Sequence, residues 1–196
     1  MAYNSVYFKK LDEVKASASK AFDSEKYARD YFDKKLVKAL DSVLDINILR
    51  IMLLADQGKT FNRYSHALGI GNLRYFLVKG VGEITDISEN TVTVVSKTDN
   101  DLHRSYNIAT EFVYGNEIRD ASGLINLNEF NNTADFNNVS AEIDKIVRSE
   151  VLPPFKSNAK KGEIVQFVGA IELNSQHLNV DNIEIIPISL KIISNK

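Results

Sequence analysis

The chain of 196 residues contains no cysteine and no tryptophan. The absence of cysteine excludes disulfides, thiolate metal sites, a cysteine nucleophile and a lipid-carrying cysteine within these residues. Only three histidines occur, and they are widely separated in the sequence: His66, His103 and His177. We find no nucleophile motif, no phosphate-binding glycine loop and no pair of metal-ligating histidines. We therefore expect a protein that is not an enzyme and that has no catalytic residues, no metal and no cofactor.

Long hydrophobic runs and excess charge are also missing. The most apolar run, residues 46–55, is about half the length of a membrane-spanning helix and contains Asn47 and Arg50. No signal peptide is evident at the N-terminus. Residues 1–72 carry 12 basic and 9 acidic side chains, and residues 73–196 carry 12 and 17, so the second part is mildly acidic. This balance argues against a nucleic-acid groove there.

Residues 1–72 show three amphipathic helical patterns. The first begins at Asp23 or Ser24, which are good N-caps. Its apolar residues recur at every fourth position: Ala28, Phe32, Leu36, Leu40 and Leu44. A second helix should start at the cap Asp45 and close at Gly58, and a third should contain His66 and end at Gly69. The helices either cover an open end or face of the following sheet, which we favour, or form a partner-binding module.

The stretch 73–87, LRYFLVKGVGEITDI, has the alternation of a strand with one buried face. The residues that share this face are Phe76, Val78, Gly80, Gly82 and Ile84. Two glycines on one face indicate a strong bend or the close approach of another strand. A long, bent strand of this kind is what a small closed barrel needs.

Four more strands and one helix follow. The strands are expected at 91–98, 104–112, 163–173 and 182–193, with Pro187 indicating an edge or a bulge in the last one. An irregular segment, 115–138, precedes a helix at 139–151 that is capped by Asn138 or Ser140 and stopped by Pro153 and Pro154. The order β-β-β-α-β-β is that of the OB-fold, a five-stranded partly open Greek-key barrel.

The predicted fold class is therefore α+β, with N-terminal helices packed on a five-stranded OB-like β-barrel. We divide the chain into an N-terminal helical segment, 1–72, and an OB-like domain, 73–196, that includes the helix 139–151. Both parts should form one structural unit.

OB-folds commonly bind ligands on the face of their second and third strands and between two loops. On that face the only clear aromatic candidate is Tyr106, and the last loop offers Asn174 and His177. Binding of single-stranded nucleic acid needs stacking aromatics in a basic groove, so nucleic acid is not expected as a partner. Asp99, Asp101 and His103 alternate and could hold a metal, but turn chemistry explains them more simply.

The most site-like stretch is 119–123, which brings together Arg119, Asp120, Ser122 and Gly123 in an expected loop. It could recognise a polar ligand or a partner. Alternatively, Arg119 and Asp120 form an internal pair while Ser122 and Gly123 shape the turn. A hydrolase would require one of the three histidines to meet Ser122 in the fold.

Four stretches resemble an uncharacterised bacterial family of predicted periplasmic lipoproteins, whose members are often encoded beside sugar ABC-transporter components. They are YFLVKGVGEITDI (75–87), RDASGLINLNEF (119–130), FNNVSAEIDKIV (136–147) and GEIVQFVGAIEL (162–173). The resemblance implies a periplasmic or envelope-attached protein whose partners are transporter components or a small polar solute. It implies membrane attachment only through an N-terminal anchor that these residues do not contain, and it transfers no catalytic residues.

These observations lead to one functional hypothesis and one alternative. The hypothesis is a non-enzymatic, envelope-located accessory protein, associated with sugar ABC transport, that binds a protein partner or a small polar ligand. The residues expected to bind are Arg119, Asp120, Ser122, Tyr106, Asn174 and His177. The alternative is a cytoplasmic OB-fold module that binds nucleic acid.

Overall fold

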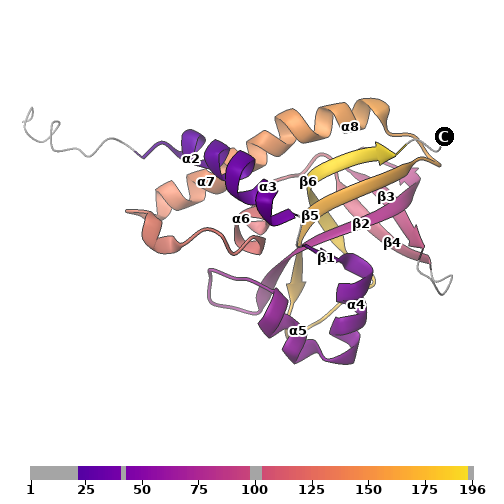
Figure 1. Ribbon diagram of the computed structural model, residues 1–196, viewed down its shortest axis with the longest axis horizontal. Coiled ribbons are helices and arrows are strands. Elements are labelled where there is room, and N and C mark those ends of the chain that lie inside the picture. The colour runs from indigo at the N-terminus through magenta and orange to yellow at the C-terminus, as the bar shows by residue number, and fades with distance from the viewer. Residues whose placement is uncertain (1–21, 41–42, 98–102, 194–196) are drawn as a thin grey trace, which may run out of the picture.

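The computed structural model describes residues 22–40, 43–97 and 103–193. It combines one six-stranded mixed sheet with helices at both ends and on one outer face, which confirms the α+β class (Figure 1). The strands are β1 (Leu44–Asp45), β2 (Leu73–Ile87), β3 (Thr91–Lys97), β4 (His103–Ala109), β5 (Ile164–Asn174) and β6 (Glu184–Ile193). Hydrogen-bonded neighbours follow the order β1-β2-β3-β4-β6-β5, and β5 also pairs with β2.

The sheet has one strand more than the five predicted. The additional strand, β1, pairs in parallel with β2 through Leu44↔Val78 and Asp45↔Lys79. Leu44 was expected at the end of the first helical stripe, but the chain is extended there. Extended backbone is required at Asp45 because an N-cap residue lies outside the helix it starts, and the Asp45 carboxylate accepts hydrogen bonds from the amides of Asn47 and Ile48.

Strand β2 has the predicted bounds and the predicted buried face, in which Phe76, Val78 and Ile84 are almost inaccessible to solvent. Its two glycines lie where neighbouring strands of the sheet approach closely. A Cβ at Gly80 would lie 2.4 Å from Cζ of Phe167, and a Cβ at Gly82 would lie 3.0 Å from the carbonyl oxygen of Val95. β2 pairs with β5 over its first part and with β3 over its last part. The two glycines therefore permit the close packing that the sequence indicated.

Two apolar clusters form on opposite sides of this sheet. The interior cluster contains Phe76, Tyr106 and Phe167 from the strands, and it is closed by Leu49 from one end and by Phe155 from the other. The outer cluster lies on the far side of β5 and β6, where the remaining helices cover the sheet. Figure 1 shows the pair α4 and α5 at the bottom of the molecule and the long run α7 to α8 across the top.

The bottom helices are α4 (Ile46–Ala55) and α5 (Gln57–Tyr64). α4 begins after Asp45 as predicted, and its C-cap is Asp56, the residue predicted to end it, but Gly58 does not close it. Instead the carboxylate of Asp56 accepts from the amide of Lys59 and starts α5, so Gly58 lies inside that helix. His66 was predicted to be helical, but it lies beyond α5 and forms an isolated antiparallel bridge with Tyr75.

The first helical stripe corresponds to α2 (Ser24–Asp30), the π-helical turn η1 (Tyr31–Leu36) and α3 (Val37–Ala39). Asp23 is the N-cap, as predicted, because its carboxylate accepts from the amide of Lys26. This run packs beside α7. No helix among the described residues is both long and apolar enough to cross a membrane.

The helix predicted at 139–151 is longer at both ends. It comprises α7 (Thr133–Ile146), the π-helical turn η4 (Val147–Val151) and α8 (Leu152–Asn158), and its N-cap is Asn132 rather than Asn138 or Ser140. Pro153 and Pro154 do not stop it. They follow the π-turn and occupy the first positions of α8, where a missing backbone N–H removes little helical hydrogen bonding.

The segment between β4 and α7 contains the short helices α6 (Glu117–Ala121) and η3 (Leu127–Glu129), although it was predicted to be irregular. β4 ends at Ala109, so Phe112 is not in the strand and its side chain is 65% exposed. In β6, Pro187 lies opposite Gly169 at a shift of register, which confirms the predicted bulge.

We expect Gly80→Ala to destabilise the protein by about 1–3 kcal/mol, because the new methyl group would overlap the fully buried ring of Phe167. The measurement is urea unfolding followed by circular dichroism. Gly69→Ala is the matched control, since nothing lies within 4 Å of a Cβ at that position. Phe167→Leu in the Gly80→Ala background should cost less than the sum of the single changes; strict additivity would contradict the proposed clash.

Candidate functional site

Helix α6 places an ion pair in the protein interior. Arg119 and Asp120 are each only 4% exposed, and Nε of Arg119 donates to Oδ1 of Asp120 across 2.6 Å. The guanidinium carbon lies 3.6 Å from the ring centroid of Phe136, and Nη1 donates to the Phe136 carbonyl across 3.5 Å. Both charges were predicted to lie in a loop, but they belong to a helix packed against β2, β5 and α7. Their fixed geometry is that of the internal pair considered above.

Ser122 shapes the end of α6. Its hydroxyl donates to the carbonyl of Arg119 across 2.9 Å and accepts from the amide of Leu124 across 3.1 Å. The next residue, Gly123, has φ of +63°, and a Cβ there would lie 2.5 Å from the ring of His66. The side-chain hydrogen bonds found among the described residues do not join Ser122 to His66, so the structure gives no support to the serine–histidine arrangement of a hydrolase.

A pocket of ≈ 300 Å³ opens beside the ion pair, and we call it the α6 pocket. Its polar wall is formed by Asn116, Arg119 and Asp120, and aromatic rings are contributed by Tyr75 and Phe136. The remaining wall comes from the segment before β2: Ala67, Leu68, Gly69, Ile70, Gly71 and Leu73. Two of the predicted binding residues therefore line one pocket.

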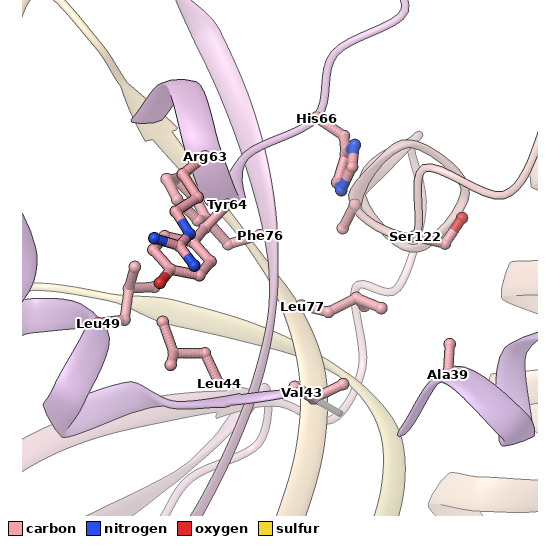
Figure 2. Close-up of a pocket in the computed structure, with 11 residues that line it drawn as sticks. Ala39, Val43, Leu44, Leu49, Arg63, Tyr64, His66, Phe76, Leu77 and Ser122 are labelled. Carbon is pink, nitrogen blue, oxygen red and sulfur yellow. The ribbon is translucent and has the colours of Figure 1, made fainter. Parts of the chain in front are cut away.

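A second pocket of ≈ 220 Å³ lies on the other side of the His66–Tyr75 bridge. Figure 2 shows His66 and Ser122 on one side of it and Arg63 with Tyr64 on the other. Its remaining lining residues are apolar: Ala39, Val43, Leu44, Leu49, Phe76, Leu77 and Ala121. Partial burial and the nearby charge of Arg74 lower the pKa of His66.

Buried carboxyl groups lie next to α6. Asp144, on α7, is 4% exposed, and burial raises its pKa to about 7, with a further contribution from the charge of Glu117. The positive charges of Arg148 and Arg119 and a hydrogen bond from the Gly115 amide act in the opposite direction. Burial also raises the pKa of Glu117. This region can therefore hold a proton near neutral pH.

The other predicted binding residues lie elsewhere. Tyr106 is 1% exposed and its hydroxyl donates to Oδ1 of Asn47 across 2.8 Å, so it is a core residue rather than an exposed ring. Side chains two residues apart in a strand lie on the same face of the sheet, and Tyr106 and Ile108 are both buried in the interior. The side chain of Asn174 accepts from the amides of Gln176 and His177 and shapes the turn after β5. His177 is exposed, and neither it nor Asn174 lines the α6 pocket.

The hypothetical metal ligands Asp99 and Asp101 lie outside the described residues. Within the described part of the chain, no three acidic or histidine side chains are grouped as metal ligands.

Several residues of this region were not predicted as functional: Tyr75, Asn116, Glu117, Phe136 and Asp144. One sequence signal was available for Asp144, because it follows Ser140 at a spacing of four within the apolar pattern of α7. A polar residue on the buried face of a helix is informative. For Tyr75 and Asn116 the contact arises only from the tertiary fold.

The order of strand pairing, with helices between β4 and β5, is the arrangement expected of an OB-fold. A solved OB-fold protein from Thermotoga maritima is similar to this chain, with a TM-score of 0.76 and 26% sequence identity over 89% of this chain and 100% of that one. The protein is therefore of the OB-fold class, with additional helices.

The family model described as "Predicted periplasmic lipoprotein (DUF2291)" matches residues 1–191. The chain belongs to this family, which confirms the predicted resemblance at the level of the family and supports a location in the periplasm or cell envelope. No curated protein matches the chain significantly.

We expect Asp144→Asn to raise the melting temperature at pH 8 by about 2–4 °C, the effect of roughly 1 kcal/mol in a protein of this size. A carboxyl group whose pKa is raised on folding stabilises the folded state most at low pH, and this contribution is lost as the pH rises to about 7. The gain should therefore be smaller at pH 5.

Differential scanning fluorimetry at both pH values tests this prediction. The matched control is Asp30→Asn, because Lys34 lowers the pKa of that exposed carboxyl group and the substitution should bring no gain at pH 8. An equal gain from Asp144→Asn at pH 5 and pH 8 would show that the charge of Asp144 is not responsible.

Proposed function

We propose that this protein is a non-enzymatic accessory protein of the cell envelope that binds a small polar solute in the α6 pocket and works with a sugar ABC transporter. The observation that carries the proposal is that Arg119 and Asp120 line a pocket of ≈ 300 Å³ together with Asn116. This volume lies at the lower end of the range for small-molecule sites, which suits a ligand of monosaccharide size.

The chemistry of the pocket fits a polyhydroxylated solute. A guanidinium, a carboxylate and an amide offer both donors and acceptors to hydroxyl groups. The rings of Tyr75 and Phe136 and the apolar segment before β2 offer surfaces for the C–H faces of a sugar ring. Arg119 is already fixed by Asp120 and Phe136, so little side-chain entropy would be lost on binding.

A thermal-shift screen with pentoses, hexoses and sugar phosphates tests the solute proposal. A solute that binds only the folded state must raise the melting temperature in a saturable manner. Asn116→Ala should weaken the response, because this exposed residue lines the pocket. Among the described residues its side chain accepts one hydrogen bond, from the hydroxyl of Ser140 across 3.3 Å. Asn131→Ala, an exposed amide outside the pocket, should leave the response unchanged.

Asp120→Ala is a poor probe, since it would leave Arg119 buried without its partner and cost about 3–5 kcal/mol of stability. If no sugar or sugar phosphate shifts the melting temperature at millimolar concentration, the proposed solute class is wrong. An equal loss of response in Asn116→Ala and Asn131→Ala would place binding outside the α6 pocket.

A second candidate function, binding of a transporter component, is favoured by the outer face of α4. Ile48, Ile51 and Leu54 follow one another on this face and are 50%, 64% and 65% exposed. A helix that is apolar on all sides is normally buried. The inner face of α4 is already used by Ile46, Leu49 and Leu53, so a partner would cover the outer one.

We expect Ile51→Asp to abolish binding to a purified sugar-transporter component in a surface plasmon resonance assay, with the melting temperature almost unchanged because the side chain is exposed. Lys59→Asp, on the neighbouring helix and 89% exposed, is the control that changes charge without removing apolar area. Binding that survives Ile51→Asp would rule out this face as the contact.

The nucleic-acid alternative finds little support. Residues that alternate with the buried ones on β3 and β4 include no Phe, Tyr or Trp in the described part of these strands: Thr91, Thr93, Val95, His103, Ser105 and Asn107. Thr93 and Asn107 also hydrogen bond to each other across 3.1 Å. The described part of this face therefore offers only the imidazole of His103 for stacking on bases, which does not favour binding of single-stranded nucleic acid.

A further inference from the structure

A groove of ≈ 490 Å³ separates the first helical run from the outer face of the sheet. The helical wall comes from η1 and α3, and the floor comes from β2, β5 and β6. The lining residues are Phe32, Val37, Leu40, Lys79, Gln166, Val168, Ile188, Ser189 and Lys191. This groove shares no residue with the α6 pocket, so its ligand is independent of the function proposed above.

The strand register places two lysines around the floor of the groove. Lys79 on β2 lies opposite Val168 on β5, and Lys191 on β6 lies opposite Gln166, two residues before Val168. The two lysines are therefore separated by two strand spacings across the sheet and by two residues along it. With ordinary strand geometry this places their Cα atoms about 12 Å apart. Extended lysine side chains can bridge this distance from both sides, so their ammonium groups can meet at one anionic group.

Apart from the two lysines, Gln166 and Ser189, the side chains that line the groove are apolar. Phe32, Leu40 and Ile188 belong to or pack against the outer apolar cluster, and Val168 forms the floor between the two lysines. Val37 on the helical wall is 51% exposed. The groove therefore has an apolar helical wall and a floor on the sheet in which two lysines flank apolar side chains.

The side chains that line the groove do not balance the positive charge of Lys79 and Lys191. No aspartate or glutamate lines the groove, and the ion pairs found among the described residues do not include Lys79 or Lys191. The acidic residues of the adjacent helix are already engaged, since Asp30 pairs with Lys34 and Asp33 with Arg29. The nearest carboxylate in the strand register, that of Asp45 opposite Lys79, is used to cap α4 through the amides of Asn47 and Ile48. Within the described part of the chain, an anionic group would therefore meet two lysines that no ion pair engages.

We propose that this groove binds an anionic amphiphile with one acyl chain, of the fatty-acid class. The chain lies between the helix and Val168, and the carboxylate lies between Lys79 and Lys191. Charge complementarity and the apolar wall select this ligand over an uncharged or cationic one, and the volume is within the range of small-molecule sites.

Isothermal titration of the full chain with decanoate, below its micelle concentration, tests the proposal. We expect saturable binding of one decanoate per chain, and binding at least tenfold weaker in Lys79→Gln/Lys191→Gln. Decyltrimethylammonium, with the same chain and the opposite charge, should bind wild type at least tenfold more weakly than decanoate. Lys59→Gln, on α5 at the bottom of the molecule, is the control for removal of a surface charge.

Val168→Glu supplies the reciprocal test. A carboxylate at this position would lie between the two lysines, so decanoate binding should be lost while the melting temperature is retained. Equal binding of decanoate and decyltrimethylammonium, or decanoate binding that is unchanged in Lys79→Gln/Lys191→Gln, would overturn the proposal. Absence of saturable decanoate binding would overturn it as well.

Discussion

The position of one aromatic ring governs much of this fold. The ring of Phe167 lies inside the sheet against Gly80 of β2, so close that a side chain at position 80 would overlap it. Because β2 can approach β5 this closely, it pairs with β5 along its first part and still turns to reach β3. The resulting interior is filled by aromatic and branched side chains, and it is closed at its two ends by Leu49 of α4 and Phe155 of α8.

The outer side of β2 and β5 has a different character, because α6 brings charged groups into it. A buried ion pair is costly to desolvate and by itself is weak evidence of stability. Here the cost is offset by a short hydrogen bond between Arg119 and Asp120 and by the stacking of the guanidinium on Phe136. These contacts fix the relative positions of α6 and α7, and thereby the polar wall of the α6 pocket and the buried carboxyl group of Asp144.

Local signals in the sequence were sufficient for features that depend on local geometry. Alternation predicted the bounds and the buried face of β2, and capping chemistry predicted Asp45 as a helix N-cap, and both are observed. The structure selects Asp23 from the two caps considered for the first helix, and a bulge rather than an edge at Pro187. The family was recognised from four stretches of sequence, and the match over residues 1–191 confirms it. None of these inferences needed a contact between distant residues.

The predictions that were wrong depended on tertiary context. The prolines after α7 should have ended the helix, but the π-turn η4 places them at tolerated positions. Tyr106 was expected on the surface because sequence alternation alone does not say which face is inside at the end of a strand. Arg119 and Asp120 were predicted in a loop because charged residues are rarely buried, and their burial depends on Phe136, which is 17 residues away from Arg119.

The added helices also explain why the candidate sites lie away from the usual ligand face of an OB-fold. The loop between β5 and β6, which commonly flanks that face, is held by Arg50 of α4 through the Val180 carbonyl and, across 2.5 Å, the Asp181 carboxylate. On β3 and β4 the side chains of Thr93 and Asn107 hydrogen bond to each other. The α6 pocket and the lysine-lined groove instead lie where a helix meets the outer face of the sheet. The helices that this chain adds to the OB-fold therefore form a wall of each proposed site.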